Sequence, residues 1–160
     1  MDRERFASAL GAIFEASPWV ADEAWPRRPF STRRALHAAM VAAVDAARAD
    51  RQVALIAAHP DLAGKVARAG ALSAASAREQ AAAGLDRLTD AEFERFHRLN
   101  DGYRARFGFP FVICVRDHTK EAILSAFETR LGNERPREIA EALRNIARIA
   151  ELRLADAVAE

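Results

Sequence analysis

The chain has 160 residues, about half of them apolar, and a net charge of +1, a composition typical of a helix-rich globular protein with its own core. The near-neutral charge, with no basic stripe, argues against a nucleic-acid partner, and no apolar run reaches the ~18 residues of a membrane span. The start, Met1 to Arg5, is charged and lacks the hydrophobic stretch of a signal peptide. Cys114 is the single cysteine, which excludes an internal disulfide and fits a reducing compartment. We therefore predict a cytoplasmic protein with no membrane partner.

The pattern of the first sixty residues predicts helices separated by proline-rich turns. A first helix, or helix pair, is indicated by apolar residues at helical spacing: Phe6, Leu10, Ile13 and Phe14. The stretch from 18 to 30 holds three prolines and two tryptophans, and we interpret it as an irregular packed corner. Ser31 is expected to cap a helix over 32–47, and Asp50 to cap a short helix that ends before His59.

Four more helices are predicted in the second part of the chain. Their N-terminal signals are a capping box at Ser76 and Glu79, a second capping box at Thr89 and Glu92, an N-cap at Thr119, and a proline at 136. In the last helix the apolar stripe is expected to run through Ile139, Leu143, Ile146, Ile149 and Leu152. The turn-rich connection from His59 to Lys65 is expected to place Gly64 in a left-handed conformation.

The helical pattern stops between Phe107 and Val115. Gly108 and Pro110 break the helix, and the residues from Phe111 to Val115 are apolar. Such a segment must be buried, yet it lacks the internal hydrogen bonds of a helix. We expect an extended segment that crosses a helical core, with amides free to bind a ligand. The predicted fold is thus all-α: a single compact domain, residues 1–160, of about eight helices with one extended apolar segment.

The four histidines differ in their settings. His37 and His97 lie in predicted helices and His118 precedes an N-cap, so we interpret all three as solvated or structural. His59 leaves an apolar helix directly before Pro60 and is expected to be partly buried. An unperturbed pKa of about 6.5 would let it carry a proton either way at neutral pH. A structural histidine satisfied in a turn is the alternative.

Polar and sulfur-bearing candidates are few. Glu79 either completes the capping box with Ser76 or, together with Ser76 and Gln80, presents polar groups to a ligand. Cys114 lies between aliphatic residues with no adjacent base, and we interpret it as a small buried hydrophobe. No metal site is predicted, because the chain lacks paired histidines at helical spacing and any Cys-x-x-Cys motif.

Four stretches together carry a resemblance to one family. They are Ser17-Pro-Trp-Val20, His59-Pro-Asp-Leu-Ala-Gly-Lys65, Ser76-x-x-Glu-Gln80 with Ala83-Gly-Leu85, and Leu99-Asn100 through Phe107-Gly-Phe-Pro-Phe-Val-Ile-Cys-Val115. Each is weak alone, but the ordered set is specific and extends along the whole chain. The chain resembles the 2-oxo-4-hydroxy-4-carboxy-5-ureidoimidazoline (OHCU) decarboxylases.

The resemblance implies a cofactor-free, usually homodimeric enzyme of urate breakdown that converts OHCU, its small-molecule substrate, into (S)-allantoin. It implies catalytic roles for His59, as proton donor, and for Glu79. The substrate-binding residues that it implies are Pro60, Ser76, Glu79, Gln80, Phe111, Val112, Ile113, Cys114 and Val115. Two alternatives stay open: a helical acid–base enzyme for another ureide, and a ureide-binding module without catalysis.

Overall fold

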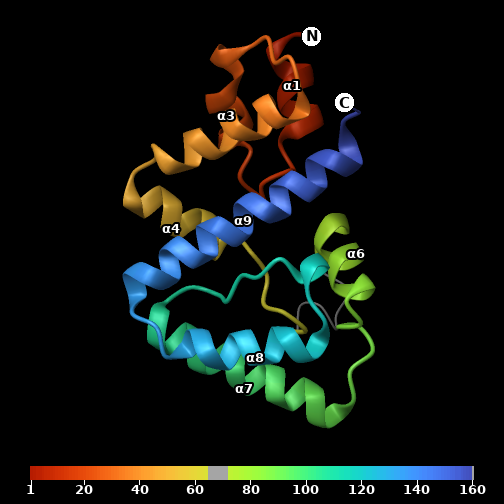
Figure 1. Cartoon of the computed structure of the whole chain (residues 1–160), viewed down its shortest axis with the longest axis vertical. Coiled ribbons are helices and arrows are strands. Elements are labelled where there is room, and N and C mark those ends of the chain that lie inside the picture. Colours follow the sequence, from red (N-terminus) through yellow and green to blue (C-terminus); the bar gives the residue numbers. More distant parts are fainter. Residues whose placement is uncertain (65–71, 160) are drawn as a thin grey trace. The chain divides into compact units, whose positions relative to one another are not determined.

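The computed structural model describes residues 1–64 and 72–159, and that part of the chain contains no strand (Figure 1). Eight α-helices and two short 3₁₀ helices, η1 and η2, are found in it, which confirms the all-α fold class. None of the described helices combines the length and hydrophobicity needed to cross a bilayer. The chain divides into two compact units, Met1–Ala58 with Ile146–Glu160, and His59–Asn145. The single-domain organisation stays a prediction.

The first unit contains the N-terminal helices and the end of the last one. Its elements are α1 (Arg3–Leu10), α2 (Trp19–Ala24), η1 (Trp25–Arg27), α3 (Arg33–Asp45), α4 (Ala49–Ala57) and the second half of α9 (Arg135–Ala157). The stretch expected to be an irregular corner holds α2 and η1, so that expectation was wrong. Pro18 is the N-cap of α2 and Pro26 lies in the first turn of η1. Helices accept proline there because those positions need no backbone donor.

Two N-caps in the first unit differ from the predicted ones. Thr32, not Ser31, caps α3, and its side chain accepts a hydrogen bond from the Ala35 amide at 3.0 Å. Adjacent serine and threonine offer the same cap chemistry, and the extended backbone falls on Thr32. Arg48 precedes α4, so Asp50 lies in the first turn, where its carboxylate suits the positive end of the helix dipole.

The second unit contains α6 (Ala74–Ala82), α7 (Asp90–Phe107), η2 (Val115–Asp117), α8 (Lys120–Leu131) and the first half of α9. The capping box of Thr89 and Glu92 at α7 is confirmed, and so is the cap of α8 by Thr119. Gly108 ends α7 with a left-handed φ of 80°. Helices α7 and α8 pack side by side (Figure 1).

The predicted extended segment lies in the core of the second unit. Residues 109–114 belong to no helix or strand, and every residue from Phe109 to Val115 is buried. Phe111 stacks on Phe127 of α8 with ring centroids 3.9 Å apart, and Tyr103 of α7 meets Phe111 edge-on at 5.4 Å. These aromatic contacts hold the segment between α7 and α8.

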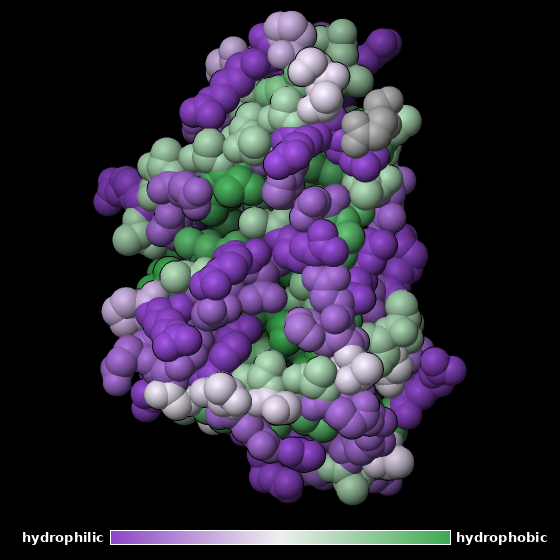
Figure 2. All heavy atoms as spheres, in the orientation of Figure 1, coloured by the Kyte–Doolittle hydropathy of each residue, from purple (hydrophilic) through white to green (hydrophobic). Residues whose placement is uncertain are grey.

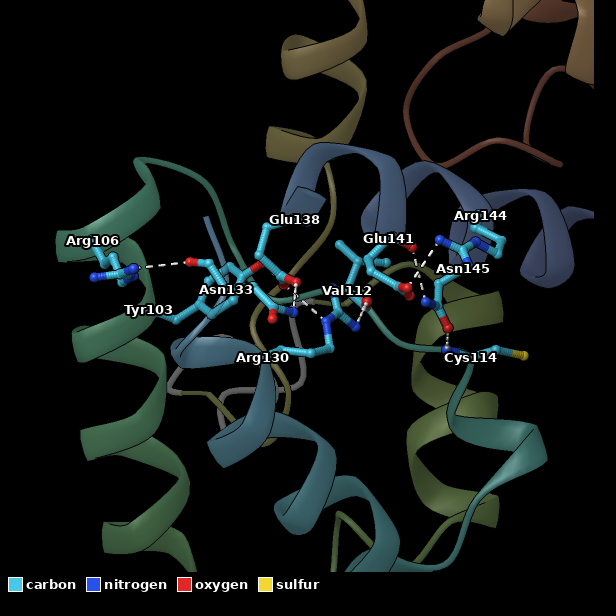
Figure 3. A network of polar contacts seen from close by, with 10 residues as sticks. All are labelled: Tyr103, Arg106, Val112, Cys114, Arg130, Asn133, Glu138, Glu141, Arg144 and Asn145. Carbon is cyan, nitrogen blue, oxygen red and sulfur yellow. Dashed lines mark hydrogen bonds and ion pairs between the residues drawn. The ribbon is translucent and has the colours of Figure 1, made fainter. Parts of the chain in front are cut away.

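The buried side of α9 differs from the predicted stripe. Ile146 and Ile149 are buried as predicted. Ile139, Leu143 and Leu152 are only half-buried, whereas Glu138 is fully buried. A hydrogen-bond network makes this possible (Figure 3). Glu138 Oε1 accepts from Tyr103 Oη at 2.6 Å and Arg130 Nε at 2.8 Å, and Oε2 accepts from Asn133 Nδ2 at 2.9 Å. Burial and the neighbouring carboxylate raise the pKa of Tyr103 far above its ordinary value, so the phenol stays a donor.

Apolar side chains are well covered. Met1 is the only large hydrophobic residue found exposed in the described part of the chain. Figure 2 shows hydrophilic side chains over much of the visible face, with smaller apolar areas between them. Large apolar side chains therefore do not mark a surface for a second copy within the described residues.

Candidate functional site

The loop that begins at His59 is held in place by side chains from α6 and α7. The amide of Ala63 donates to Gln80 Oε1 at 3.0 Å, and Gln80 Nε2 donates to the Asp61 carbonyl at 3.4 Å. Asn100 Nδ2 donates to the Leu62 carbonyl at 2.9 Å. Three successive residues of the loop thus have their main chain fixed.

His59 lies at the start of this loop, one residue after Ala58, the C-cap of α4. Its exposed fraction is 7%, which confirms that it is buried. Pro60, which follows it, is half-buried and limits the backbone freedom of the histidine. An imidazole in this setting has little orientational freedom, as a positioned proton donor requires.

The left-handed residue in the loop is Ala63, with φ 50°, and not Gly64 as predicted. Position 64 requires a glycine for a steric reason instead. A Cβ built on Gly64 would lie 2.9 Å from the Asp61 Cβ, so any larger residue would push against the loop. Lys65, the last residue of the motif, lies outside the described residues.

Helix α6 begins three residues earlier than its predicted capping box implies. Ser73 is the N-cap, and its side chain accepts from the Ser76 amide at 3.2 Å. The box of Ser76 and Glu79 was therefore a wrong prediction, because the earlier serine has the same hydroxyl and takes the cap. Glu79 lies in the middle of the helix, which removes the capping explanation for it.

The inner face of α6 is polar. Its two buried residues are Ser76 and Gln80, each 5% exposed, and Glu79 beside them is half-buried. Spacings of three and four residues place all three side chains on one face. The alanines of α6 are instead half-buried or exposed. Helices normally bury their apolar face, so this inversion indicates a face that serves a polar partner.

Two main-chain groups of the extended segment are held by side chains (Figure 3). Arg130 Nη1 donates to the Val112 carbonyl at 2.8 Å, and the Cys114 amide donates to Asn145 Oδ1 at 3.1 Å. The expectation that the amides are all free was therefore wrong for Cys114, because the carboxamide of Asn145 on α9 reaches it. Cys114 itself is 2% exposed, as expected of a small hydrophobe.

Within the second unit, α6 contacts both of the other predicted stretches. Gln80 joins α6 to the loop after His59, and α6 packs against η2, which begins at Val115. A cavity of about 420 Å³ also borders α6, lined by Ala63, Gln80, Phe93 and other residues. Its lining lacks His59, Glu79 and the segment from Phe111 to Val115, so we do not assign it to the site.

The remaining histidines have structural settings. His37 Nε2 is 2.7 Å from the Ala147 carbonyl, His97 lies 3.3 Å from Asp101, and His118 follows η2 as its C-cap. Within residues 1–64 and 72–159, no group of three or more potential metal ligands is found.

Sequence reasoning missed the polar residues that support the site. Asn100 belongs to one of the family motifs, whereas no local motif distinguishes Arg130, Glu138 or Asn145. A glutamate inside an apolar helical stripe was the available signal for Glu138. Its meaning depends on which helix supplies the partner, which local pattern does not reveal.

Comparisons with known proteins identify the family of this chain. A family model described as OHCU decarboxylase matches residues 1–155. A relative from Haloferax volcanii, named 2-oxo-4-hydroxy-4-carboxy-5-ureidoimidazoline decarboxylase, is 44% identical over 156 residues, 98% of this chain and 90% of the relative.

Two solved structures share the fold. A crystal structure of (S)-allantoin synthase has a TM-score of 0.78 and 33% identity, and covers 99% of this chain. This chain spans about half, 51%, of that crystallised chain. A crystal structure of OHCU decarboxylase in the presence of (S)-allantoin has a TM-score of 0.70 and covers 98% of this chain and 97% of its own; at 19% identity it shows the fold alone. The chain belongs to the OHCU decarboxylase family.

Proposed function

We propose that this protein decarboxylates OHCU to (S)-allantoin in urate degradation, as a lyase that needs no cofactor. Relatives of known name support the reaction, since the Haloferax volcanii protein carries the name of this decarboxylase. The observation that carries the proposal for this chain is the polar face of α6. Gln80 on that face is hydrogen-bonded to the loop that His59 begins.

The chemistry suits ordinary side chains. OHCU carries a carboxylate on a carbon of an electron-poor ring. When carbon dioxide leaves, the bonding electrons pass to that carbon and are delocalised over the imine and carbonyl groups of the ring. The protein must hold the ring, favour the loss of the carboxylate and deliver one proton to one face of the neighbouring ring carbon, which bears the ureido group. The carbon that lost the carboxylate becomes a carbonyl of allantoin, and its hydroxyl proton passes to the ring nitrogen.

In the proposed mechanism His59 supplies that proton and so determines the (S) configuration. Its burial limits the approach of water, and Pro60 with the Phe111 ring would form a dry wall that strengthens polar contacts. Glu79 would accept hydrogen bonds from the ureido and ring N–H groups.

Ser76 and Gln80 complete the polar face toward the ligand. A carboxamide nitrogen carries two hydrogens, so Gln80 can hold the Asp61 carbonyl and still donate to the substrate. The main chain from Phe111 to Val115 would bind ring or carboxylate oxygens, in a role similar to an oxyanion hole. The Cys114 amide already has Asn145 as its acceptor, so the neighbouring peptide groups are the better candidates.

Freshly generated OHCU provides the decisive assay. The protein should accelerate its decay and yield only the (S) enantiomer of allantoin, followed by circular dichroism. Binding of allantoin with no acceleration over spontaneous decay would identify a non-catalytic module instead. Inertness toward OHCU together with turnover of another ureide would identify the other enzyme class.

The assembly and the compartment belong to the same proposal. We infer a homodimer that works in the cytoplasm, as the family resemblance implies. Sedimentation should give about twice the chain mass of 17.6 kDa. A single-chain mass at micromolar concentration would refute the dimer and leave the reaction untouched.

A further inference from the structure

Two peptide groups flank Ile113, and each of them is held by one side chain (Figure 3). Arg130 donates to the carbonyl of Val112, on the N-terminal side, at 2.8 Å. Asn145 accepts from the amide of Cys114, on the C-terminal side, at 3.1 Å. The two side chains come from different helices, α8 and α9.

Both side chains are themselves fixed. Arg130 Nε is paired with the fully buried Glu138 at 2.8 Å, and its guanidinium lies 4.4 Å from the centre of the Phe111 ring. Asn145 Nδ2 donates to the Glu141 carbonyl at 2.9 Å, which sets the direction of its carboxamide oxygen. Neither the Arg130 nor the Asn145 side chain, which we call the two clamps, can rotate without losing a second interaction.

Because peptide groups are planar, holding the two flanking peptides also fixes the directions of the Ile113 N–H and C=O. In a trans peptide the N–H and C=O groups point to opposite sides, and the one cis bond found in the described residues is Arg28-Pro29. The Ile113 N–H therefore points away from Arg130. By the same reasoning, the Ile113 C=O points away from Asn145.

These two main-chain groups have no hydrogen-bond partner among the described residues. Ile113 is 5% exposed, so bulk water does not readily replace a partner. Buried main-chain donors and acceptors in native proteins are nearly always paired. One directed donor and one directed acceptor at a single residue thus indicate a ligand.

We propose that Arg130 and Asn145 are positioning residues that present the Ile113 N–H and C=O to the substrate as a two-point contact. A cyclic ureide has N–H groups next to C=O groups along its edge, and it can meet one donor and one acceptor at once. The inference rests on the proposed function, because it assigns this pair to the ring or ureido edge of OHCU. The clamps act through the main chain and do not touch the reacting carbon.

The first test follows the Ile113 amide directly. In ¹⁵N-labelled wild-type protein, saturating (S)-allantoin should shift the Ile113 amide resonance and slow its hydrogen exchange. In Asn145→Leu and Arg130→Lys the response should shrink, because the peptide planes are no longer held. An Ile113 amide that ignores allantoin in the wild type would overturn the proposal, even if both variants were too unstable to study.

Kinetics separate positioning from a merely structural role. Asn145→Leu should raise KM for OHCU ~10- to 100-fold, as small misplacements of binding groups do, and leave the shape of the pH profile unchanged. Asn145→Asp retains a carboxyl oxygen to accept from Cys114 and should recover most of that loss. A wild-type KM in folded Asn145→Leu would refute the clamp.

Arg144→Leu is the matched control, since this neighbouring residue on α9 is exposed and pairs with Glu141. It should retain the wild-type KM. Failure of the wild type to turn over OHCU would defeat the proposed function. Normal turnover with an unresponsive Ile113 amide would defeat this inference alone.

Discussion

At the scale of single residues, two side chains carry the proposed chemistry and their settings differ. His59 is buried at the start of a loop whose carbonyls and amides are held from α6 and α7. Glu79 is half-buried in the middle of α6. Local sequence favoured a capping role for Glu79, and only the position of Ser73 removes that explanation.

Replacing His59 by asparagine should abolish most of the activity and leave the fold intact. The change removes the proton donor and keeps a polar side chain at a buried position. We expect kcat for OHCU to fall ~10²–10⁴-fold, the usual contribution of general acid–base catalysis. His97→Asn, at a half-exposed helical site, is the control and should retain the wild-type rate. Full activity in His59→Asn would remove this histidine from the mechanism.

Glu79→Gln tests the carboxylate. Because Glu79 is not a cap, the unfolding free energy should change little, while kcat/KM should fall ~10²-fold through the loss of a charged acceptor. Ser73→Ala is the opposite control. Removal of the true cap should cost about 1 kcal/mol of unfolding free energy with kcat/KM unchanged. Wild-type kcat/KM in Glu79→Gln would return this residue to a structural role.

At the scale of elements, an ion pair joins the N-termini of α7 and α8. Glu92, in the first turn of α7, forms an ion pair with Lys120 in the first turn of α8 at 2.5 Å. The Lys120 ammonium and the Thr89 amide lower the pKa of Glu92 from 4.5 to about 2. One carboxylate thus serves its own capping box and also links two packed helices.

This pair predicts a pH dependence of stability. A carboxyl whose folded-state pKa is lowered contributes stability that is fully present above its unfolded pKa and is lost as the pH falls toward about 2. The difference in urea midpoint between the wild type and Glu92→Gln should therefore be largest above pH 5 and shrink toward pH 2. A difference that is constant across this range would contradict the shifted pKa. Because both groups are accessible to solvent, the effect should also weaken in high salt.

At the scale of the molecule, the second unit depends on one buried charge network. Glu138 collects hydrogen bonds from Tyr103 on α7, Arg130 on α8 and Asn133, so a single carboxylate joins three helices. Arg130 extends the network to the segment through the Val112 carbonyl. Stability and the geometry of the proposed ligand contact thus have a common origin.

Glu138→Gln should be strongly destabilising, because it leaves the Arg130 charge buried without its counterion. Loss of one partner of a buried pair typically costs ~3–5 kcal/mol, measurable as a drop in unfolding free energy in urea. Glu141→Gln, whose pair with Arg144 lies at the surface, should cost less than ~1 kcal/mol. An equal loss of unfolding free energy in the two variants would show that the buried network stabilises the fold no more than a surface ion pair does.

Much of the architecture was predictable because its signals are local. The capping box at Thr89, the cap at Thr119 and the break at Gly108 depend on neighbours within a few residues, and all three predictions are confirmed. Where prediction failed, as at Ser31 and Ser76, two nearby residues offered the same hydroxyl. Local chemistry cannot choose between equal candidates.

The sequence by itself determined the all-α class, the family and the apolar segment that interrupts the helices. Only the tertiary structure decided that α6 turns a polar face inward, that Gln80 holds the loop after His59, and that Arg130 and Asn145 fix the peptides around Ile113. The reason is physical. Periodicity and caps arise between residues close along the chain, whereas a buried polar group is defined by a partner from a distant helix, which only folding brings within hydrogen-bonding distance.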